Sequence, residues 1–239
     1  MKISIVGKGN VGTHLYNAFK EKFDTTLIDS RNPRNLNPSN IAIVCVKDDA
    51  IKEVVQNLKG KARIIAHTSG SVPMEILNPY SRDYGVFYPL QTFTKNVDLC
   101  YHSIPFFIEG NNQHTVEVLR ELANAISGKV KECSSEERKK LHLSAVFACN
   151  FSNALFTVAH KLLDSADISF DMLLPLIKQT VDKLDKLSPE AAQTGPAVRN
   201  DSFIISRHLE MLQNEPKLAE IYRLMTELIR DNSRNPVIK

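Results

Sequence analysis

The sequence predicts an α/β protein in which a doubly wound parallel sheet at the N-terminus is followed by an all-α C-terminal domain. Two observations predict this class. Short apolar runs alternate with amphipathic stretches through the first half of the 239-residue chain. After Cys133 the pattern becomes helical, with breaks at prolines. We therefore expect a sheet domain over residues 1–133 and a helical domain over residues 134–239.

The first strand, residues 3–6, is apolar and runs directly into a glycine-rich turn. The helical pattern after it places apolar side chains at Val11, Leu15, Ala18 and Phe19. Further strands are predicted at residues 25–29, 41–46, 62–66, 84–87, 104–109 and 129–131, and further helices at residues 48–58 and 115–126. The run at 41–46 is continuously apolar, which is typical of a parallel strand covered on both faces.

The second half is predicted to be helical throughout. Ser134 and Glu137 can form a capping box at its start. Helices are predicted at residues 135–163, 170–186, 200–213 and 216–231, and Pro175 is expected to kink the second helix or delay its start. Residues 141–159 contain no Lys, Arg, Asp or Glu but several polar side chains. We therefore expect a helix buried in protein rather than a membrane span, and a homodimer through the C-terminal helical domain.

Composition narrows the class of protein. Hydrophobic residues make up 43% and charged residues 24% of the chain, as in soluble globular proteins. A net charge of +3, without a basic tract interleaved with aromatic residues, indicates no nucleic-acid partner. The four cysteines form no C-x-x-C pair, so no disulfide or metal site is expected, and Cys45 and Cys149 lie in apolar runs typical of buried thiols. No signal peptide precedes the first strand, so we expect a cytoplasmic location.

The turn after the first strand reads G-x-G-x-x-G and leads into a helix, as at the phosphate-binding corner of a Rossmann dinucleotide-binding domain. In that motif, Gly7 permits the tight turn, Gly9 lets a pyrophosphate approach the backbone, and Gly12 lets helix and strand pack closely. The helix N-terminus adds free N–H groups and a partial positive charge. The predicted cofactor contacts here are Gly7, Lys8, Gly9, Asn10, Val11 and Gly12.

The end of the second strand bears on the choice between NAD and NADP. Asp29 can accept the ribose 2′-OH of NAD, whereas Ser30 and Arg31 can bind the 2′-phosphate of NADP. We favour NADP because a Ser-Arg pair is hard to explain for NAD, although Asp29 as the strand-end residue would repel the phosphate. Val46 and Lys47 follow the third strand and are also predicted cofactor contacts.

Two further polar loops leave the carboxyl ends of predicted strands, where ligands bind in open α/β sheets. The first contains His67-Thr68-Ser69-Gly70, a set of polar side chains that a plain loop does not require. The second, Tyr88-Pro89-Leu90-Gln91-Thr92-Phe93, forms either a pocket wall or a rigid proline turn.

The predicted long helix and the segment after it supply further polar candidates. At about 100° per residue, His142 and Asn153 lie about 20° apart in projection, and Asn150 lies about 60° from Asn153. These side chains either tie helices together or contact a ligand, because buried amides need partners. Arg199 and Asp201 can bind a substrate or a partner subunit, but we favour a structural ion pair over a ligand contact.

Five motifs together give this chain a family resemblance over nearly its whole length. They are Gly7-Lys8-Gly9-Asn10-Val11-Gly12, His67-Thr68-Ser69-Gly70, Tyr88-Pro89-Leu90-Gln91-Thr92-Phe93, Ala148-Cys149-Asn150-Phe151 and Thr194-Gly195-Pro196-Ala197-Val198-Arg199-Asn200-Asp201. The chain resembles the Rossmann-like DUF2520 family, often labelled NADP oxidoreductases and related to the 6-phosphogluconate dehydrogenase and pyrroline-5-carboxylate reductase group. Three positions depart from the family pattern: Tyr88 replaces a His, Asn200 replaces a Gly, and Lys8 replaces a small residue and offers a further phosphate contact.

The resemblance implies an N-terminal Rossmann domain, a helical dimerisation domain and an active-site cleft between them. It names no substrate. Related β-hydroxyacid dehydrogenases use a lysine on the long helix with an asparagine four residues later. Here Lys140 is followed by Ser144, so their mechanism is not carried over.

We therefore expect an NADP-dependent oxidoreductase that transfers a hydride between NADP(H) and a small polar carbonyl, imine or hydroxyacid in that cleft. The predicted catalytic residues, with a His as proton donor and amides that orient the substrate, are His67, Ser69, His142, Asn150 and Asn153. The alternative is an NADP-binding sensor or regulatory protein without catalysis. Hydride exchange with a deazaflavin is a third possibility that no residue here demands.

Overall fold

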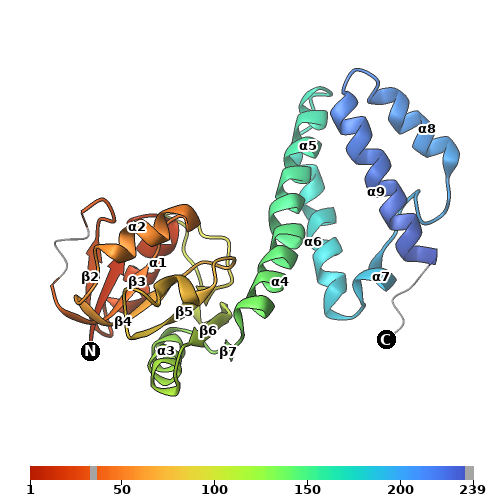
Figure 1. Cartoon of the computed structure of the whole chain (residues 1–239). Helices are drawn as coiled ribbons and strands as arrows, with labels where there is room; N and C mark the ends of the chain where they lie inside the picture. Colours follow the sequence, from red (N-terminus) through yellow and green to blue (C-terminus); the bar gives the residue numbers. More distant parts are fainter. Residues whose placement is uncertain (33–36, 235–239) are drawn as a thin grey trace. The chain divides into compact units, whose positions relative to one another are not determined.

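The structure is a computed structural model that describes residues 1–32 and 37–234. The chain divides into two compact units, Met1–Leu155 and Phe156–Lys239, which are described separately (Figure 1). The first unit contains the sheet and the beginning of the long helix, and the second is helical. The predicted domain boundary between residues 133 and 134 stays a prediction.

The sheet of the first unit has seven strands in the order β2-β1-β3-β4-β5-β6-β7. Their bounds are β1 Lys2–Val6, β2 Asp24–Ile28, β3 Ser39–Val44, β4 Ala62–His67, β5 Asp83–Pro89, β6 Phe106–Gly110 and β7 Val130–Glu132. Strands β2, β1, β3, β4 and β5 pair in parallel, so their carboxyl ends share one edge of the sheet. The α/β class with an N-terminal Rossmann-like sheet is therefore confirmed.

The predicted parallel sheet has one exception, because β5 and β6 are antiparallel. A parallel neighbour needs a crossover, usually a helix on one face of the sheet. Between β5 and β6 the chain forms only the short 3₁₀ helix Tyr101–Ser103 and otherwise irregular backbone. The chain therefore returns beside β5 in the opposite direction, and parallel pairing resumes between β6 and β7.

Helices cover both faces of the sheet. They are α1 Asn10–Phe19, α2 Ile51–Gln56 and α3 Gln113–Ile126, with 3₁₀ helices at Asp48–Ala50 and Met74–Leu77. Side chains of α1 and α3 pack with Ile41 and Ile43 in one apolar cluster. Side chains of α2 pack with Ala42 and Val44 in the other. This alternation along β3 shows that the strand is buried on both faces, as its continuous apolar run predicts.

The long helix consists of α4 Ser135–Ala145, a π-helical segment Val146–Phe151 and α5 Ser152–Asp164. After it come the 3₁₀ helix Phe170–Leu173, α6 Leu174–Asp182, the 3₁₀ helix Lys183–Asp185, α7 Pro189–Ala192, α8 Ser202–Met211 and α9 Pro216–Arg234. Pro175 lies in the first turn of α6, so the delayed start is the outcome that the structure adopts. The capping box of Ser134 and Glu137 is also formed.

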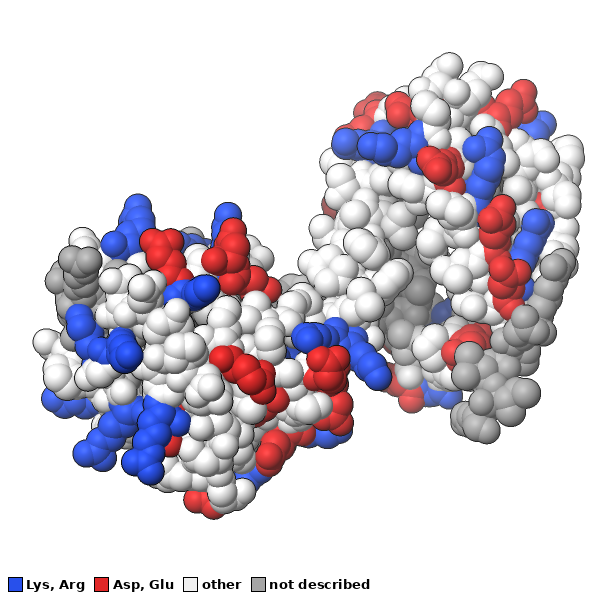
Figure 2. Space-filling model, in the orientation of Figure 1, with Lys and Arg blue, Asp and Glu red and all other residues white. Residues whose placement is uncertain are grey.

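The apolar part of the long helix is not buried within the single chain, so its expected burial in protein stays a prediction. By length and composition alone, Ser135–Asp164 could cross a membrane. An 18-residue stretch of it has a mean hydropathy of 1.3, and no residue of that stretch is buried. Cys149 is exposed, although Cys45 is buried as expected. Figure 2 shows a stretch of this helix's visible surface without Lys, Arg, Asp or Glu, as the sequence of residues 141–159 requires. The predicted homodimer, which would cover this surface, stays a prediction.

Candidate functional site

Two of the three motif glycines are required by packing within the sheet unit. Gly7 has a φ of 122°, and a Cβ there would lie 2.2 Å from the Cys45 carbonyl oxygen. A Cβ on Gly12 would lie 1.9 Å from the Gly7 carbonyl oxygen. Larger residues at either position would push α1 away from the strands. Gly7 and Gly12 therefore have structural reasons to be glycine, as the motif predicts.

Gly9 has no such structural reason. Its backbone is extended, with φ of −73° and ψ of −173°, and a Cβ there would meet no described atom within 4 Å. Gly9 is also the N-cap of α1, whose first turn receives no side-chain cap from the described residues. An open approach to the backbone beside free helix N–H groups fits a dinucleotide pyrophosphate. The residues present therefore fit the group that the motif predicts.

The other predicted cofactor contacts differ in their exposure and in the residues that they touch. Lys8 and Lys47 are exposed, Val46 is half-buried, and the positive charge of Lys8 acts on Asp29. Val11 packs against the apolar cluster, so its contribution to a ligand is its backbone N–H. The Asn10 side chain donates from Nδ2 to the Phe93 carbonyl, 2.8 Å away, and so holds the loop after β5 against α1.

Asp29 and Arg31 form an ion pair just beyond the end of β2. The Asp29 carboxylate accepts hydrogen bonds from Arg31 Nη2 at 2.8 Å, from Nε at 3.1 Å and from the backbone N–H at 3.0 Å. The side-chain hydrogen bonds hold the pKa of Asp29 well below its usual range. The Arg31 side chain remains 89% exposed. The charge of Asp29, which would repel a 2′-phosphate, is therefore balanced by Arg31, while Ser30 is half-buried beside them.

His67 and Ser69 shape the turn after β4. The His67 side chain is 0% exposed, and its Nδ1 accepts the Ser69 backbone N–H at 3.2 Å. Burial and the positive charge of Arg138 lower the pKa of His67 to about 3, and the Pro73 carbonyl acts weakly the other way. Ser69 Oγ accepts the backbone N–H groups of Ser71 and Val72. Both side chains are buried in the single chain, and their predicted catalytic roles stay predictions.

His142 lies over the same turn and contacts a residue that the sequence reasoning did not assign to the site. Its Nδ1 is 3.0 Å from the hydroxyl oxygen of Tyr88, at the end of β5, and the two rings meet edge to face. A Cβ on Gly70 would lie 2.7 Å from the His142 ring, so the imidazole packs directly on that glycine. Two signals pointed to Tyr88: it begins a loop weighed as a pocket wall, and it stands where the family resemblance expects a histidine.

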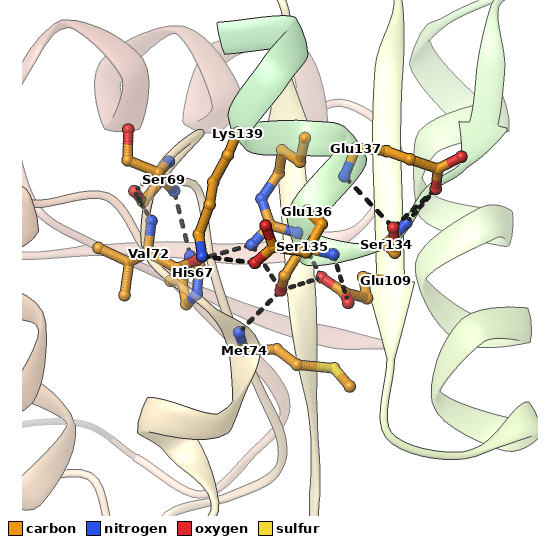
Figure 3. A network of polar contacts seen from close by, with 12 residues as sticks. His67, Ser69, Val72, Met74, Glu109, Ser134, Ser135, Glu136, Glu137 and Lys139 are labelled. Carbon is orange, nitrogen blue, oxygen red and sulfur yellow. Dashed lines mark hydrogen bonds and ion pairs between the residues drawn. The ribbon is translucent and has the colours of Figure 1, made fainter. Parts of the chain in front are cut away.

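A buried ion pair between Arg138 and Glu109 fixes the start of α4 on the sheet, where Figure 3 shows Ser135 beside Glu109. Arg138 is 0% exposed, pairs with Glu109 of β6 and donates from Nη2 to the Val72 carbonyl at 2.6 Å. Glu109 also accepts the backbone N–H and the hydroxyl of Ser135, both at 2.8 Å. Arg138 precedes His142 by about one helical turn. The network therefore places the His142 side chain over the carboxyl edge of the sheet.

Asn150 and Asn153 are exposed in the single chain, and Asn150 lies within a π-helical segment whereas Asn153 lies just beyond it. The π-helical segment Val146–Phe151 stands between His142 and Asn153. The predicted angle of about 20° assumes a regular α-helix, so it does not apply across this wider turn. Such π-bulges are frequent at functional sites. The roles of Asn150 and Asn153 stay predictions.

In the second unit, the turn before α8 explains one departure from the family pattern. Asn200 has a φ of 51°, a left-handed conformation that glycine and asparagine tolerate better than other residues. Asp201 accepts the Ile204 backbone N–H at 3.2 Å and caps α8. The described residues show no ion pair of Arg199 or of Asp201, so the favoured structural ion pair is not found within the described part of the chain. The described part of the chain also holds no group of three or more His, Cys, Asp or Glu residues suited to a metal ion.

Comparisons with known proteins agree with this architecture. The chain is similar to the crystal structure of a "putative NADP oxidoreductase" from Bacteroides fragilis, with 35% identity and a TM-score of 0.90 over 96% of this chain and 98% of that chain. A protein from Thermotoga maritima has 23% identity and a TM-score of 0.74, over 98% and 99% of the two chains. A pyrroline-5-carboxylate reductase from Coxiella burnetii shares the fold at 13% identity and a TM-score of 0.54, over 99% and 98%. A comparison with curated proteins found no match.

A family model supports the same relationship from the sequence. The model of DUF2520, a domain of unknown function, matches residues 104–229, which include β6, α3 and most of the helical region. The resemblance inferred from the five motifs is thereby confirmed. The chain belongs to the DUF2520 family.

Proposed function

We propose that this protein is an NADP-dependent oxidoreductase that transfers a hydride between NADP(H) and a small polar substrate. The observation that carries the proposal is Gly9, a motif glycine that no packing contact with a described residue requires and that leaves the backbone open to a ligand. The similarity to the Bacteroides fragilis protein, whose description names NADP, supports it. A bound nicotinamide would supply the hydride chemistry, and the protein would bind and orient both reactants and move the proton.

The preference for NADP over NAD rests on Arg31. A guanidinium held by Asp29 and otherwise open to solvent can turn one edge to a 2′-phosphate. Lys8 adds a second positive charge near the same carboxylate. In this arrangement, Asp29 orients Arg31 instead of accepting a ribose hydroxyl.

Calorimetric titration with NADPH and NADH tests this proposal. The wild type should bind NADPH more tightly, and Arg31→Ala should lose most of that preference because the 2′-phosphate loses its charged partner. Arg82→Ala is the matched control, since Arg82 is an exposed arginine that precedes β5 at the opposite edge of the sheet. Equal binding of NADH and NADPH by the wild type would make Asp29 the ribose contact and contradict the NADP assignment.

A non-catalytic NADP sensor is a second candidate, favoured by the burial of His67 and Ser69. In addition, the Ser144 hydroxyl donates to the Lys140 carbonyl at 2.9 Å, where the related dehydrogenases have a catalytic asparagine. The sensor predicts tight NADPH binding without turnover of any carbonyl, imine or hydroxyacid. Oxidation of NADPH by any of these substrates would exclude it.

A further inference from the structure

The contact between Tyr88 and His142 indicates how the proton side of the proposed reaction is arranged. We infer that Tyr88 is the positioning residue of His142: its hydroxyl donates to Nδ1, keeps the imidazole proton on Nε2, and so presents Nε2–H to the oxygen of a carbonyl substrate. This inference rests on the proposed function for its substrate, but the state of the histidine can be measured without any cofactor.

The direction of the hydrogen bond follows from burial. Tyr88 is 8% exposed, and the one hydrogen bond of its hydroxyl among the described residues joins it to His142 Nδ1 at 3.0 Å. Burial raises the pKa of Tyr88 to about 12, so the phenol keeps its proton at neutral pH. If Nδ1–H donated to Tyr88 instead, a buried hydroxyl hydrogen would have no acceptor. The neutral imidazole therefore accepts at Nδ1 and carries its proton on Nε2.

Two features keep the imidazole in this orientation. Gly70 contacts one part of the ring so closely that a single added methyl would meet Cγ and Nδ1 at 2.7 Å. The buried pair of Arg138 and Glu109 fixes the preceding helical turn on the sheet. His142 is half-buried, and its Nε2 makes no hydrogen bond with the residues that the structure describes. That nitrogen is therefore available to a ligand.

The arrangement favours a carbonyl substrate because a neutral Nε2–H can donate to a carbonyl oxygen but cannot accept from a protonated imine or a hydroxyl group. Hydride addition to the carbonyl carbon leaves an alkoxide. The Nε2–H bond then breaks as the new O–H bond forms, and the Tyr88 O–H bond breaks as Nδ1 takes that proton. After the alcohol leaves, water gives a proton to Nε2 and the Nδ1 proton returns to the phenoxide, so the starting tautomer is restored and the net change is one proton taken from solvent.

The charges around Tyr88 act on this transfer in opposite directions. Arg138 favours the phenoxide that forms briefly, whereas Asp48 and Cys133 oppose it. An alkoxide is a stronger base than a phenoxide, so the transfer from Tyr88 through His142 to the alkoxide runs downhill. The histidine needs no rotation, since each nitrogen keeps its partner throughout.

Nitrogen-15 NMR of the histidine side chains, in the full chain without cofactor, tests the inference. The His142 resonances are assigned by their loss in His142→Gln. The wild type should show one neutral tautomer with the proton on Nε2, and Tyr88→Phe should show a mixture of both tautomers. Tyr84→Phe is the matched control, because Tyr84 lies on the same strand and forms its hydrogen bond, through its backbone N–H, with Asn111. Tyr101→Phe should alter the signals of its neighbour His14 and leave those of His142 unchanged.

A second variant keeps both partners but separates them. Gly70→Ala should displace the His142 ring and give the same tautomer mixture while Tyr88 is intact. A wild-type proton on Nδ1, or an unchanged tautomer in both Tyr88→Phe and Gly70→Ala, would overturn the inference. The proposed function fails separately, if the wild type shows the predicted tautomer but binds no NADPH. If turnover is found, Tyr88→Phe should lower kcat at least tenfold for carbonyl reduction and leave the KM for NADPH unchanged.

Discussion

Replacement of Gly9 by alanine separates a ligand-binding glycine from a structural one. The backbone of Gly9 suits alanine, and its Cβ would meet no described atom within 4 Å. Loss of unfolded-state entropy stabilises such a variant by about 0.4–1 kcal/mol, and the poorer N-cap offsets a similar amount. The free energy of unfolding should therefore change by less than about 1 kcal/mol, a shift in Tm of roughly 2–4 °C at most.

The binding of NADPH by Gly9→Ala should change far more than its stability. The new methyl would stand where the pyrophosphate approaches the N–H groups of α1, and each charge-assisted hydrogen bond lost costs about 1.5–3 kcal/mol. The dissociation constant should therefore rise by about 10-fold to 150-fold for each bond. Calorimetric titration measures the affinity, and thermal unfolding measures the stability of the same samples.

Gly12→Ala is the matched control, because its Cβ would lie 1.9 Å from the Gly7 carbonyl oxygen. That overlap should destabilise the fold by about 1–3 kcal/mol or more. The reasoning is refuted if Gly9→Ala binds NADPH as tightly as the wild type, or if it loses stability as Gly12→Ala does.

Three further predictions concern stability and assembly. His67 stays neutral in the folded protein down to about pH 3, whereas in the unfolded chain it is protonated below about pH 6.5. Its contribution to the free energy of unfolding therefore falls by about 1.4 kcal/mol per pH unit as the pH drops from 6.5 to 3. Urea titrations from pH 6 to pH 4 should therefore show a shallower pH slope for His67→Asn than for the wild type, and equal slopes would contradict the burial argument. Arg138→Met should lower the free energy of unfolding by about 3–5 kcal/mol because it leaves the Glu109 carboxylate without its cationic partner. Adding Glu109→Leu should restore much of that loss in the same urea assay, and a double variant without recovery would contradict the role of the ion pair. Light scattering should give twice the mass of one chain for the wild type and the mass of one chain for Phe147→Glu, because Phe147 is 60% exposed on the uncharged stretch of the long helix. A monomeric wild type would contradict the predicted homodimer.

The parts of the fold that could be predicted are those fixed by local chemistry. The strand, glycine turn and helix at residues 2–19 follow from apolar period and glycine spacing, and the capping box of Ser134 and Glu137 follows from two residues three positions apart. The antiparallel pairing of β5 and β6 could not be predicted, because both strands carry ordinary strand patterns. The one sequence feature that bears on whether β6 runs parallel or antiparallel to β5 is the missing helical pattern between them, because a parallel crossover usually contains a helix.

The candidate site was predicted only where a single motif contains all its parts. The contact of Tyr88 with His142 joins positions 54 residues apart, and neither residue has a local pattern that indicates the other. The π-helical segment has no recognised sequence signal, so the predicted angle between His142 and Asn153 assumes a regular α-helical pitch that the chain does not keep there. The sequence singled out His67 as part of a polar loop, but His67 ends β4, and its lowered pKa depends in part on Arg138, from a distant helix.

The most direct test of the central claim is a crystal structure of the protein grown with NADP⁺. The account predicts that the pyrophosphate lies against Gly9 and the first turn of α1, with the 2′-phosphate beside Arg31 and the nicotinamide on the side of the sheet edge where His142 lies. A dinucleotide bound elsewhere, or a 2′-phosphate that points away from Arg31, would contradict it.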